Sequence, residues 1–215
     1  MQRLRVRFSR GEEIKYISHL DIVRLWQRAL HRAEIPPLYS QGFSPHPRIV
    51  LAAPLPLGVT SQAELMDVYF SKGLSPHAFN SAVSRQLPGG IGILQVYQIE
   101  ATLPSMQAQV RYADYNIGIS TEKSDQDLEV MLTSMLSLEQ LPWQHQRDTG
   151  LRCYDLRALI NDLWFVERLE RQCIIGMRLS CGSHGSGRPE QVVAALGFAG
   201  YPQFIHRTRL ILETN

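Results

Sequence analysis

The residue types best suited to chemistry gather in one segment, residues 39–48, which reads YSQGFSPHPR. Pro45 and Pro47 each remove a backbone N–H donor, restrict φ and bias the preceding residue towards extended geometry. The segment is therefore predicted to be a stiff loop, which can hold polar side chains in place at little entropic cost. The alternative is a well-made surface turn in which His46 is merely exposed.

The side chains of this segment suit ligand contact better than catalysis. Tyr39 and Phe43 could stack on a nucleobase, an interaction worth about 1–3 kcal/mol per base, or could plug the edge of the core. His46 could hydrogen-bond a base edge or a phosphate, or pack on the two rings. We also expect Ser40, Gly42 and Arg48 of the same segment to contact the ligand.

A second histidine precedes this segment and opens an enzymatic alternative. His19 and His46 could form a general acid/base pair, with Asp21 orienting one imidazole. The simpler reading makes His19 a first-turn residue and Asp21 a capping partner of Ser18. Tyr16, just upstream, has the same two interpretations as the loop aromatics, base stacking or core packing.

The charge distribution favours an anionic partner at the N-terminal end of the chain. The net charge is only +2, yet the first fifty residues hold a clear surplus of arginine and lysine over acidic residues. A local cationic surplus of this kind is typical of a surface that binds nucleic acid, although a solvated charged face would look the same.

The elements that must position these residues can be read from periodicity. Residues 3–8 alternate as a half-buried strand, with Leu4, Val6 and Phe8 on one side. A helix follows from Ser18, with an apolar stripe and a separate arginine ridge. That ridge has one arginine every four residues, Arg24, Arg28 and Arg32. We expect Arg24 and Arg28 to contact phosphates and Arg32 to be solvated.

The remaining elements complete two similar halves. Residues 48–53, 64–70 and 91–99 are predicted strands, and Ser75 with Pro76 begins a second helix, which gives the order β-α-β-β-α-β. The second half repeats the plan less clearly. Its predicted strands are 109–119, 151–156, 171–181 and 203–212, its helices are 124–136 and one from Pro189, and residues 158–162 form a helical turn.

This pattern predicts an α+β protein of two tandem ferredoxin-like (βαββαβ) domains, residues 1–100 and 108–215, joined by a linker at 101–107. A sheet with both helices on one side leaves its other face open, and RNA-recognition modules of this topology use that face. We expect Arg3, Arg5 and Arg7 to project there from the first strand, and Arg207 from the last.

A Gly/Ser-rich loop at residues 182–190 is the second candidate site. It enters a helix N-terminus, where free amides favour an anion, and we expect Ser186 and Arg188 to contact a phosphate. It lacks the lysine–serine/threonine ending of a Walker A loop, so nucleotide hydrolysis is not expected. Cys181 and His184 lack a second ligand pair, so no metal site is predicted.

Composition bounds the remaining classes. The chain has 215 residues, 44% of them hydrophobic, which is typical of a globular protein. No apolar run approaches the ~20 residues that span a bilayer, so no membrane association is expected. An odd count of three cysteines indicates reduced thiols and a cytoplasmic location.

Three segments carry a family resemblance: residues 17–21 (ISHLD), 39–48 and 54–59 (PLPLGV). Together they resemble the radical-SAM-linked domain of unknown function, a family found beside, or fused to the end of, a radical SAM protein. Residues 154–157, 185–189 and 206–208 match more loosely. The resemblance implies an accessory role near RNA or translation, because the family lies close to ribosomal-protein and ribonuclease genes.

The cysteines are too dispersed for the CxxxCxxC spacing that holds a [4Fe–4S] cluster, since they stand at Cys153, Cys173 and Cys181. We therefore expect no cofactor on this chain. The iron–sulfur cluster and S-adenosylmethionine would belong to the radical SAM partner.

The leading hypothesis is a cytoplasmic, non-catalytic accessory protein that presents an RNA of the tRNA or rRNA class to a radical SAM partner. One alternative is a metal-independent RNA-processing enzyme that uses His46 or His19 as acid or base. Another is a protein-interaction scaffold for the radical SAM protein, in which the arginine faces would meet an acidic surface.

Overall fold

The computed structural model describes residues 1–147, 150–170, 172–182 and 185–213. Within it the chain divides into two compact units. Unit 1 comprises residues 1–110 with Leu212 and Glu213, and unit 2 comprises residues 111–211. None of the helices in these described residues is long and apolar enough to cross a membrane.

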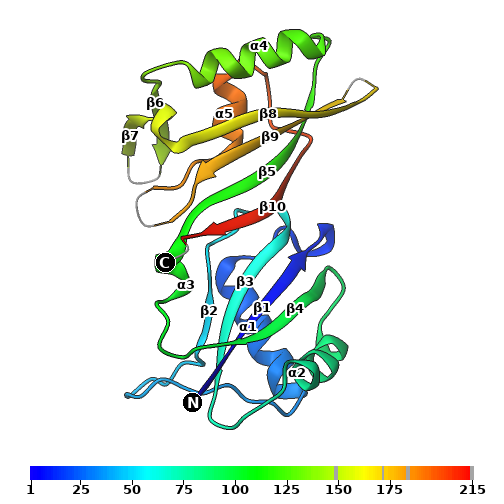
Figure 1. The fold of residues 1–215 in the computed structure, drawn as a ribbon, viewed down its shortest axis with the longest axis vertical. Coiled ribbons are helices and arrows are strands. Elements are labelled where there is room, and N and C mark those ends of the chain that lie inside the picture. The colour runs from blue at the N-terminus through cyan, green and yellow to red at the C-terminus, as the bar shows by residue number, and fades with distance from the viewer. Residues whose placement is uncertain (148–149, 171, 183–184, 214–215) are drawn as a thin grey trace. The chain divides into compact units, whose positions relative to one another are not determined.

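Unit 1 is built on an antiparallel sheet with the strand order β4-β1-β3-β2 (Figure 1). Its elements follow the chain as β1 (Gln2–Arg10), the 3-10 helix η1 (Glu12–Ile14), α1 (His19–Arg32), β2 (Ile49–Leu51), β3 (Thr60–Phe70), α2 (Pro76–Val83), the 3-10 helix η2 (Ser84–Gln86), β4 (Ile91–Ile99) and α3 (Met106–Gln109).

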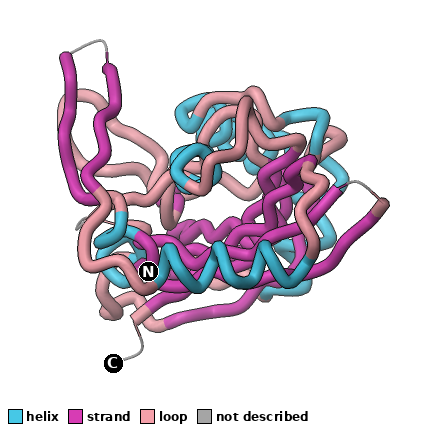
Figure 2. The backbone as a smooth tube through the Cα atoms, turned by 90° about the horizontal axis from the view of Figure 1, so that it is seen from above, coloured by secondary structure: helices cyan, strands magenta, loops and turns pink. Residues whose placement is uncertain are grey.

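Unit 2 has the corresponding strand order, β10-β5-β9-β8. Its elements are β5 (Val110–Ser120), α4 (Asp125–Leu136), β6 (Pro142–Arg147), β7 (Gly150–Asp155), the 3-10 helix η3 (Arg157–Leu159), β8 (Ile160–Leu169), β9 (Gln172–Ser180), α5 (Pro189–Ala195) and β10 (Phe204–Leu212). Strands β6 and β7 pair with each other in a separate two-stranded sheet, and Figure 2 shows this pair projecting as an arm.

Local capping explains why the helices of unit 1 begin where they do. At α1, the Ser18 hydroxyl accepts a hydrogen bond from the backbone N–H of Asp21. At α2, Ser75 accepts from the N–H of Ala78, and Pro76 occupies the first turn, where its missing N–H is not needed. Both helix starts agree with the sequence prediction.

The core of unit 1 lies between the helices and one face of the sheet. Trp26 of α1 is fully buried and meets the ring of Phe8 edge-on at 5.0 Å. Leu4 and Val6 share this face of β1, and Phe79 brings α2 onto the same core. In Figure 1, α1 accordingly lies behind β1 and β3. The alternate residues of β1 must therefore face the other side of the sheet.

The mixed α+β class is confirmed. The helical turn predicted at residues 158–162 is shorter and begins earlier, because η3 covers Arg157–Leu159 and strand β8 begins at Ile160. The segment predicted as a linker, residues 101–107, includes the start of α3 at Met106. Strand β6 was not predicted at all.

Candidate nucleic-acid interface

The first two arginines of β1, Arg3 and Arg5, are buried in unit 1 and form ion pairs there. Arg3 donates to Asp67 from Nε and Nη2 at 3.0 and 2.6 Å, and Arg5 donates to the same carboxylate at 2.8 and 3.0 Å. The exposed fractions are 1% for Arg3, 6% for Arg5 and 0% for Asp67. The prediction that Arg3 and Arg5 project from an open cationic face is therefore wrong.

The covering segment explains this burial. Arg3 also donates to the backbone carbonyls of Leu103 and Pro104, at 2.7 and 3.1 Å, so residues after β4 lie against the sheet where open space was expected. Burial lowers the pKa of Arg5, but the hydrogen bonds and charge of Asp67 outweigh it and leave the pKa raised. These guanidiniums have a structural role.

Of the two other arginines predicted on the open face, Arg7 is exposed and Arg207 is buried. Arg7 is exposed on β1, and its Nε donates a hydrogen bond to the carbonyl of Gln62 at 3.3 Å. Arg207 of β10 is fully buried. The prediction that it projects from an open face of the sheet is therefore wrong.

The 182–190 loop offers little for anion binding. Ser186 and Arg188 are exposed, and Arg188 lies 3.8 Å from Glu190, which partly neutralises it. The helix that follows, α5, has seven residues and makes a correspondingly small dipole. Residues 183 and 184 of this loop lie outside the described residues.

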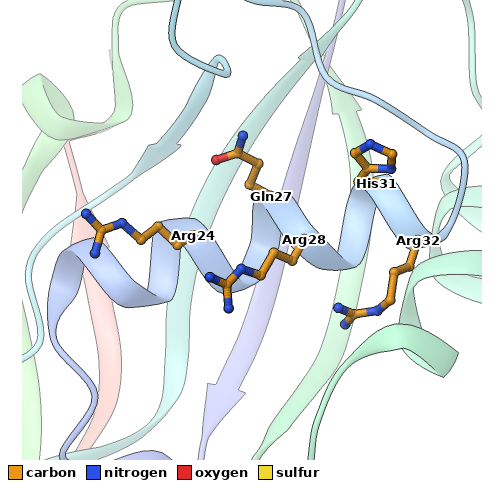
Figure 3. A pocket seen from close by; sticks show the side chains of 5 residues that line it. All are labelled: Arg24, Gln27, Arg28, His31 and Arg32. Carbon is orange, nitrogen blue, oxygen red and sulfur yellow. The ribbon is translucent and has the colours of Figure 1, made fainter.

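The predicted arginine ridge on α1 is present. Figure 3 shows the side chains that line an open depression of about 460 Å³ on one face of this helix. We call this the α1 basic face, and it consists of Arg24, Gln27, Arg28, His31 and Arg32. Gln27 and His31 were missed from the sequence, although their offsets of three or four residues from the arginines place them on neighbouring positions of the same helix surface.

The three arginines of this face differ in the hydrogen bonds and ion pairs that they form within the protein. Arg24 pairs with Asp21 at 3.0 Å, and Arg32 donates to the carbonyl of Gln86. Within the described residues Arg28 makes no hydrogen bond, although its charge contributes to lowering the pKa of Asp21. The pKa of Asp21 is lowered, chiefly by the hydrogen bond from Ser18 and then by Arg24. Arg28 is thus the cation most available to an anion.

The 39–48 loop is closed on itself by hydrogen bonds. The Ser40 N–H donates to the carbonyl of His46 at 2.8 Å, and the His46 N–H donates to the Ser40 hydroxyl at 3.0 Å. Tyr39 and Pro47 form a β-bridge at its base. Gly42 has φ of +127°, a backbone conformation that side chains with a Cβ rarely adopt. The loop is therefore held in one shape from both ends.

The aromatic side chains of the loop face solvent. Phe43 is 110% exposed, so the alternative in which it plugs the core is wrong, and Tyr39 is 45% exposed. The Tyr39 hydroxyl accepts a hydrogen bond from Nε2 of Gln27 at 3.5 Å, which joins the base of the loop to the α1 basic face. The base of the loop thus contacts the helix surface through Tyr39 and Gln27. Of the other predicted residues, Arg24 and Arg28 lie on the helix, and Ser40, Gly42 and Phe43 lie further along the loop.

Arg48, the last residue of the 39–48 loop, is held by two contacts within unit 1. Its guanidinium stacks on the ring of Tyr69, 4.1 Å from the centroid, and contacts the Met1 sulfur at 3.1 Å. Because stacking leaves the in-plane N–H donors of an arginine usable, Arg48 keeps some capacity to bind an anion.

His19 and His46 do not meet each other in the described residues, and Tyr16 lies at the surface. His46 is exposed and His19 half-buried, and neither imidazole hydrogen-bonds the other or a carboxylate there. Tyr16 is 73% exposed beside Lys15. The described part of the chain also holds no group of three His, Cys, Asp or Glu side chains placed to bind a metal ion.

The chain belongs to a bacterial protein family described as "Uncharacterized protein conserved in bacteria (DUF2344)", whose model matches residues 3–189. No curated protein matches it. This assignment agrees with the expectation of a family without a known activity.

Solved structures of low sequence identity resemble the fold. One is a structure of an H/ACA RNP bound to a substrate RNA containing 2'-deoxyuridine, with a TM-score of 0.50 and 10% identity over 96% of this chain and 47% of that chain. A Cbf5-Nop10-Gar1 complex gives a TM-score of 0.48 at 10% identity, over 96% and 48% of the two chains. An archaeal box H/ACA sRNP Nop10-Cbf5 complex gives 0.49 at 9% identity, over 98% and 47%. The chain thus spans about half the length of the chains it matches.

Proposed function

We propose that this protein is a non-catalytic RNA-binding accessory protein that presents an RNA of the tRNA or rRNA class to a radical SAM partner in the cytoplasm. The observation that carries the proposal is the α1 basic face of unit 1 and its hydrogen bond, through Gln27, to Tyr39 at the base of the 39–48 loop. The cations and hydrogen-bonding side chains of this face and the exposed aromatics of the loop are the three kinds of group that single-stranded nucleic-acid sites combine.

The arginines of α1 suit a phosphate backbone by their spacing. Residues four apart on an α-helix are separated by about 6 Å along its axis, so Arg24, Arg28 and Arg32 form a row about 12 Å long. Three like charges on successive turns repel one another, and a polyanion that lies along the row relieves the repulsion. Arg28 has no competing hydrogen bond in the described residues, which makes it the central phosphate contact.

The strand orders support an RNA-recognition architecture. In both units the last strand of the β-α-β-β-α-β plan lies beside the first, followed by the third and the second, which is the ferredoxin-like order. We therefore interpret the protein as two tandem ferredoxin-like domains, with β6 and β7 inserted in the second. The matched fold in an H/ACA RNP bound to RNA is consistent with this interpretation at the level of the fold alone.

The partner follows from the resemblance of residues 17–21, 39–48 and 54–59 to the radical-SAM-linked family. Under this proposal the partner holds the iron–sulfur cluster and S-adenosylmethionine, and this chain supplies RNA affinity. The three cysteines lack the spacing of a radical SAM motif, so the division of labour is compatible with the sequence.

The test is the salt dependence of binding to total cellular RNA, measured by filter retention with purified protein. Each phosphate contact on a single strand contributes about −0.7 to the slope of log K against log salt, so three arginines predict about −2. Binding that does not respond to salt, or no binding to any fraction, contradicts the proposal. Capture of a radical SAM protein from cells with no RNA competition would favour the scaffold instead.

A further inference from the structure

The most unusual exposed side chain of unit 1 is Phe43, which is 110% exposed at the tip of the 39–48 loop. A phenylalanine buries 150–250 Å² when it packs, so leaving the whole ring in water forgoes a large apolar contribution. The ring sits on a loop whose ends are fastened by the two Ser40–His46 hydrogen bonds. The exposed ring therefore stands on a loop that is fastened at its base.

We infer that this protein binds unpaired RNA, with a base stacked on Phe43 and the adjoining phosphates along the α1 basic face. The inference rests on the proposed function and adds the class of RNA that the site accepts. Each part of it follows from a different feature of the surface.

A stacking contact requires an accessible base face. In a duplex each base face is covered by its neighbours, and the major groove of an A-form helix is too narrow for side chains to read. A single ring at a loop tip can reach a base only when that base is unpaired or splayed out. Phe43 thus selects single strands, bulges or loops over continuous double helix.

The conformational restriction of the loop favours base stacking on Phe43 rather than a loose hydrophobic contact. The φ of +127° at Gly42, next to Phe43, sets the direction of the chain at the tip, and Pro45 and Pro47 stiffen the return limb. Because little conformational freedom remains to be lost, a base can stack with a small ordering cost.

A hydrogen bond connects the base of the loop that carries Phe43 to the α1 basic face. Tyr39 stands at the base of the loop, 45% exposed, and its hydroxyl is hydrogen-bonded to Gln27 in the middle of the α1 basic face. Under this inference the RNA strand runs from Phe43 past Tyr39 towards Arg28, so that two aromatic side chains and then a cation contact it.

The experiment compares one oligoribonucleotide in two forms. A fluorescein-labelled, unstructured RNA of about 12 nucleotides is titrated with full-length protein by anisotropy, alone and annealed to its complement. We expect the single strand to bind at least about tenfold more tightly than the duplex. Phe43→Ala is expected to weaken single-strand binding by about 5- to 150-fold and to leave duplex binding unchanged.

Two variants separate stacking from other effects of the substitution. Phe43→Trp keeps an aromatic surface and is expected to retain affinity within about twofold, whereas Phe43→Leu keeps bulk without a π-face and is expected to behave like Phe43→Ala. Tyr201→Ala is the matched control, because Tyr201 is an aromatic of unit 2 with 62% exposure. Since Phe43 makes no core contact, its variants are expected to fold normally.

The outcomes distinguish the inference from the proposed function. Equal binding of single strand and duplex, with Phe43→Ala like the wild type, overturns the inference and leaves RNA binding intact. Absence of binding to both forms overturns the proposed function itself. Unchanged RNA affinity in Phe43→Ala, together with loss of a co-purifying protein, overturns the inference in favour of protein docking by Phe43.

Discussion

Arg3 and Asp67 form an ion pair of 2.6 Å in which the two side chains are 1% and 0% exposed. Arg5 shares the same carboxylate, so two guanidiniums meet a single anion inside unit 1. The further hydrogen bonds from Arg3 to the carbonyls of Leu103 and Pro104 fasten the segment after β4 to the sheet. Asp67 is therefore the residue on which this arrangement depends.

Asp67→Asn is expected to destabilise unit 1 by about 3–5 kcal/mol, because it leaves two buried cations without a counter-charge. Urea unfolding followed by tryptophan fluorescence would measure the change, since Trp26 lies in the core of this unit. The loss should appear as a lower midpoint with little change in slope.

Asp114→Asn in unit 2 is the matched control. Arg178 also binds its carboxylate through two hydrogen bonds, at 2.8 and 2.9 Å, but the Arg178 side chain is 32% exposed. Solvent can stabilise a guanidinium that loses its partner there, so the expected loss is on the order of 1 kcal/mol. Equal losses for the two variants would contradict a special role for burial around Asp67.

The sequence predicted the direction of the β1 side chains but not what they meet. Alternation correctly separates Leu4, Val6 and Phe8, which join the core, from the arginines on the other side. It cannot reveal that Arg5 is in register with Asp67, because register depends on long-range pairing of β1 with β3. The prediction of an open cationic face was wrong because it did not include this pairing of the arginines with Asp67.

In the second half of the chain, hydrophobic periodicity did not predict strand β8. Strand β8 was missed because its pairing with β9 is interrupted at two places, between Ile160 and Asp162 and between Phe165 and Glu167. Each irregularity inserts a residue and breaks the alternation that identifies a strand. The α1 ridge was found because a regular helix keeps its period over its whole length.

Arg28→Ala is expected to weaken RNA binding and to reduce the salt slope by about 0.7, because one phosphate contact is lost. Arg7→Ala is the control, since Arg7 is an exposed arginine on β1 that is not part of the α1 basic face. We expect Arg7→Ala to leave affinity and slope unchanged. If Arg7→Ala were the more damaging of the two, the binding surface would lie on the sheet and the interface proposed on α1 would be wrong.

The three cysteines give a prediction about native reactivity. Cys153 is exposed, whereas Cys173 and Cys181 are buried, and burial raises the pKa of the Cys173 thiol. Because the thiolate is the reactive species, N-ethylmaleimide should modify Cys153 rapidly in the folded protein. Cys173 should react only when the unit opens.

Mass spectrometry of the alkylated protein checks this order, with Cys153→Ser as the control that should remain unlabelled under native conditions. Labelling of Cys173 at the rate of Cys153 without denaturant would contradict the burial of β9. Addition of urea should bring the rates of all three thiols together.

Asp21→Asn is expected to strengthen RNA binding, because Asp21 is the acidic residue that pairs with Arg24 on the edge of the α1 basic face. The lowered pKa of Asp21 keeps it ionised at neutral pH, so it competes there with a phosphate for Arg24. Asparagine retains an oxygen that can accept from Ser18 and removes the charge. A modest gain of about two- to fivefold in affinity at low salt, together with a steeper salt slope, is the expected result.

The same pKa shift fixes how this variant should respond to acid. A lowered folded pKa means that Asp21 stabilises the start of α1 at pH values above its ordinary value of 3.8, and that this contribution is lost as the pH falls through the lower folded value. Asp21→Asn should therefore show a smaller loss of stability on acidification than the wild type. Weaker RNA binding by a variant that passes this stability check would mean that Asp21 itself contacts the RNA, and it would contradict the expected competition between Asp21 and phosphate for Arg24.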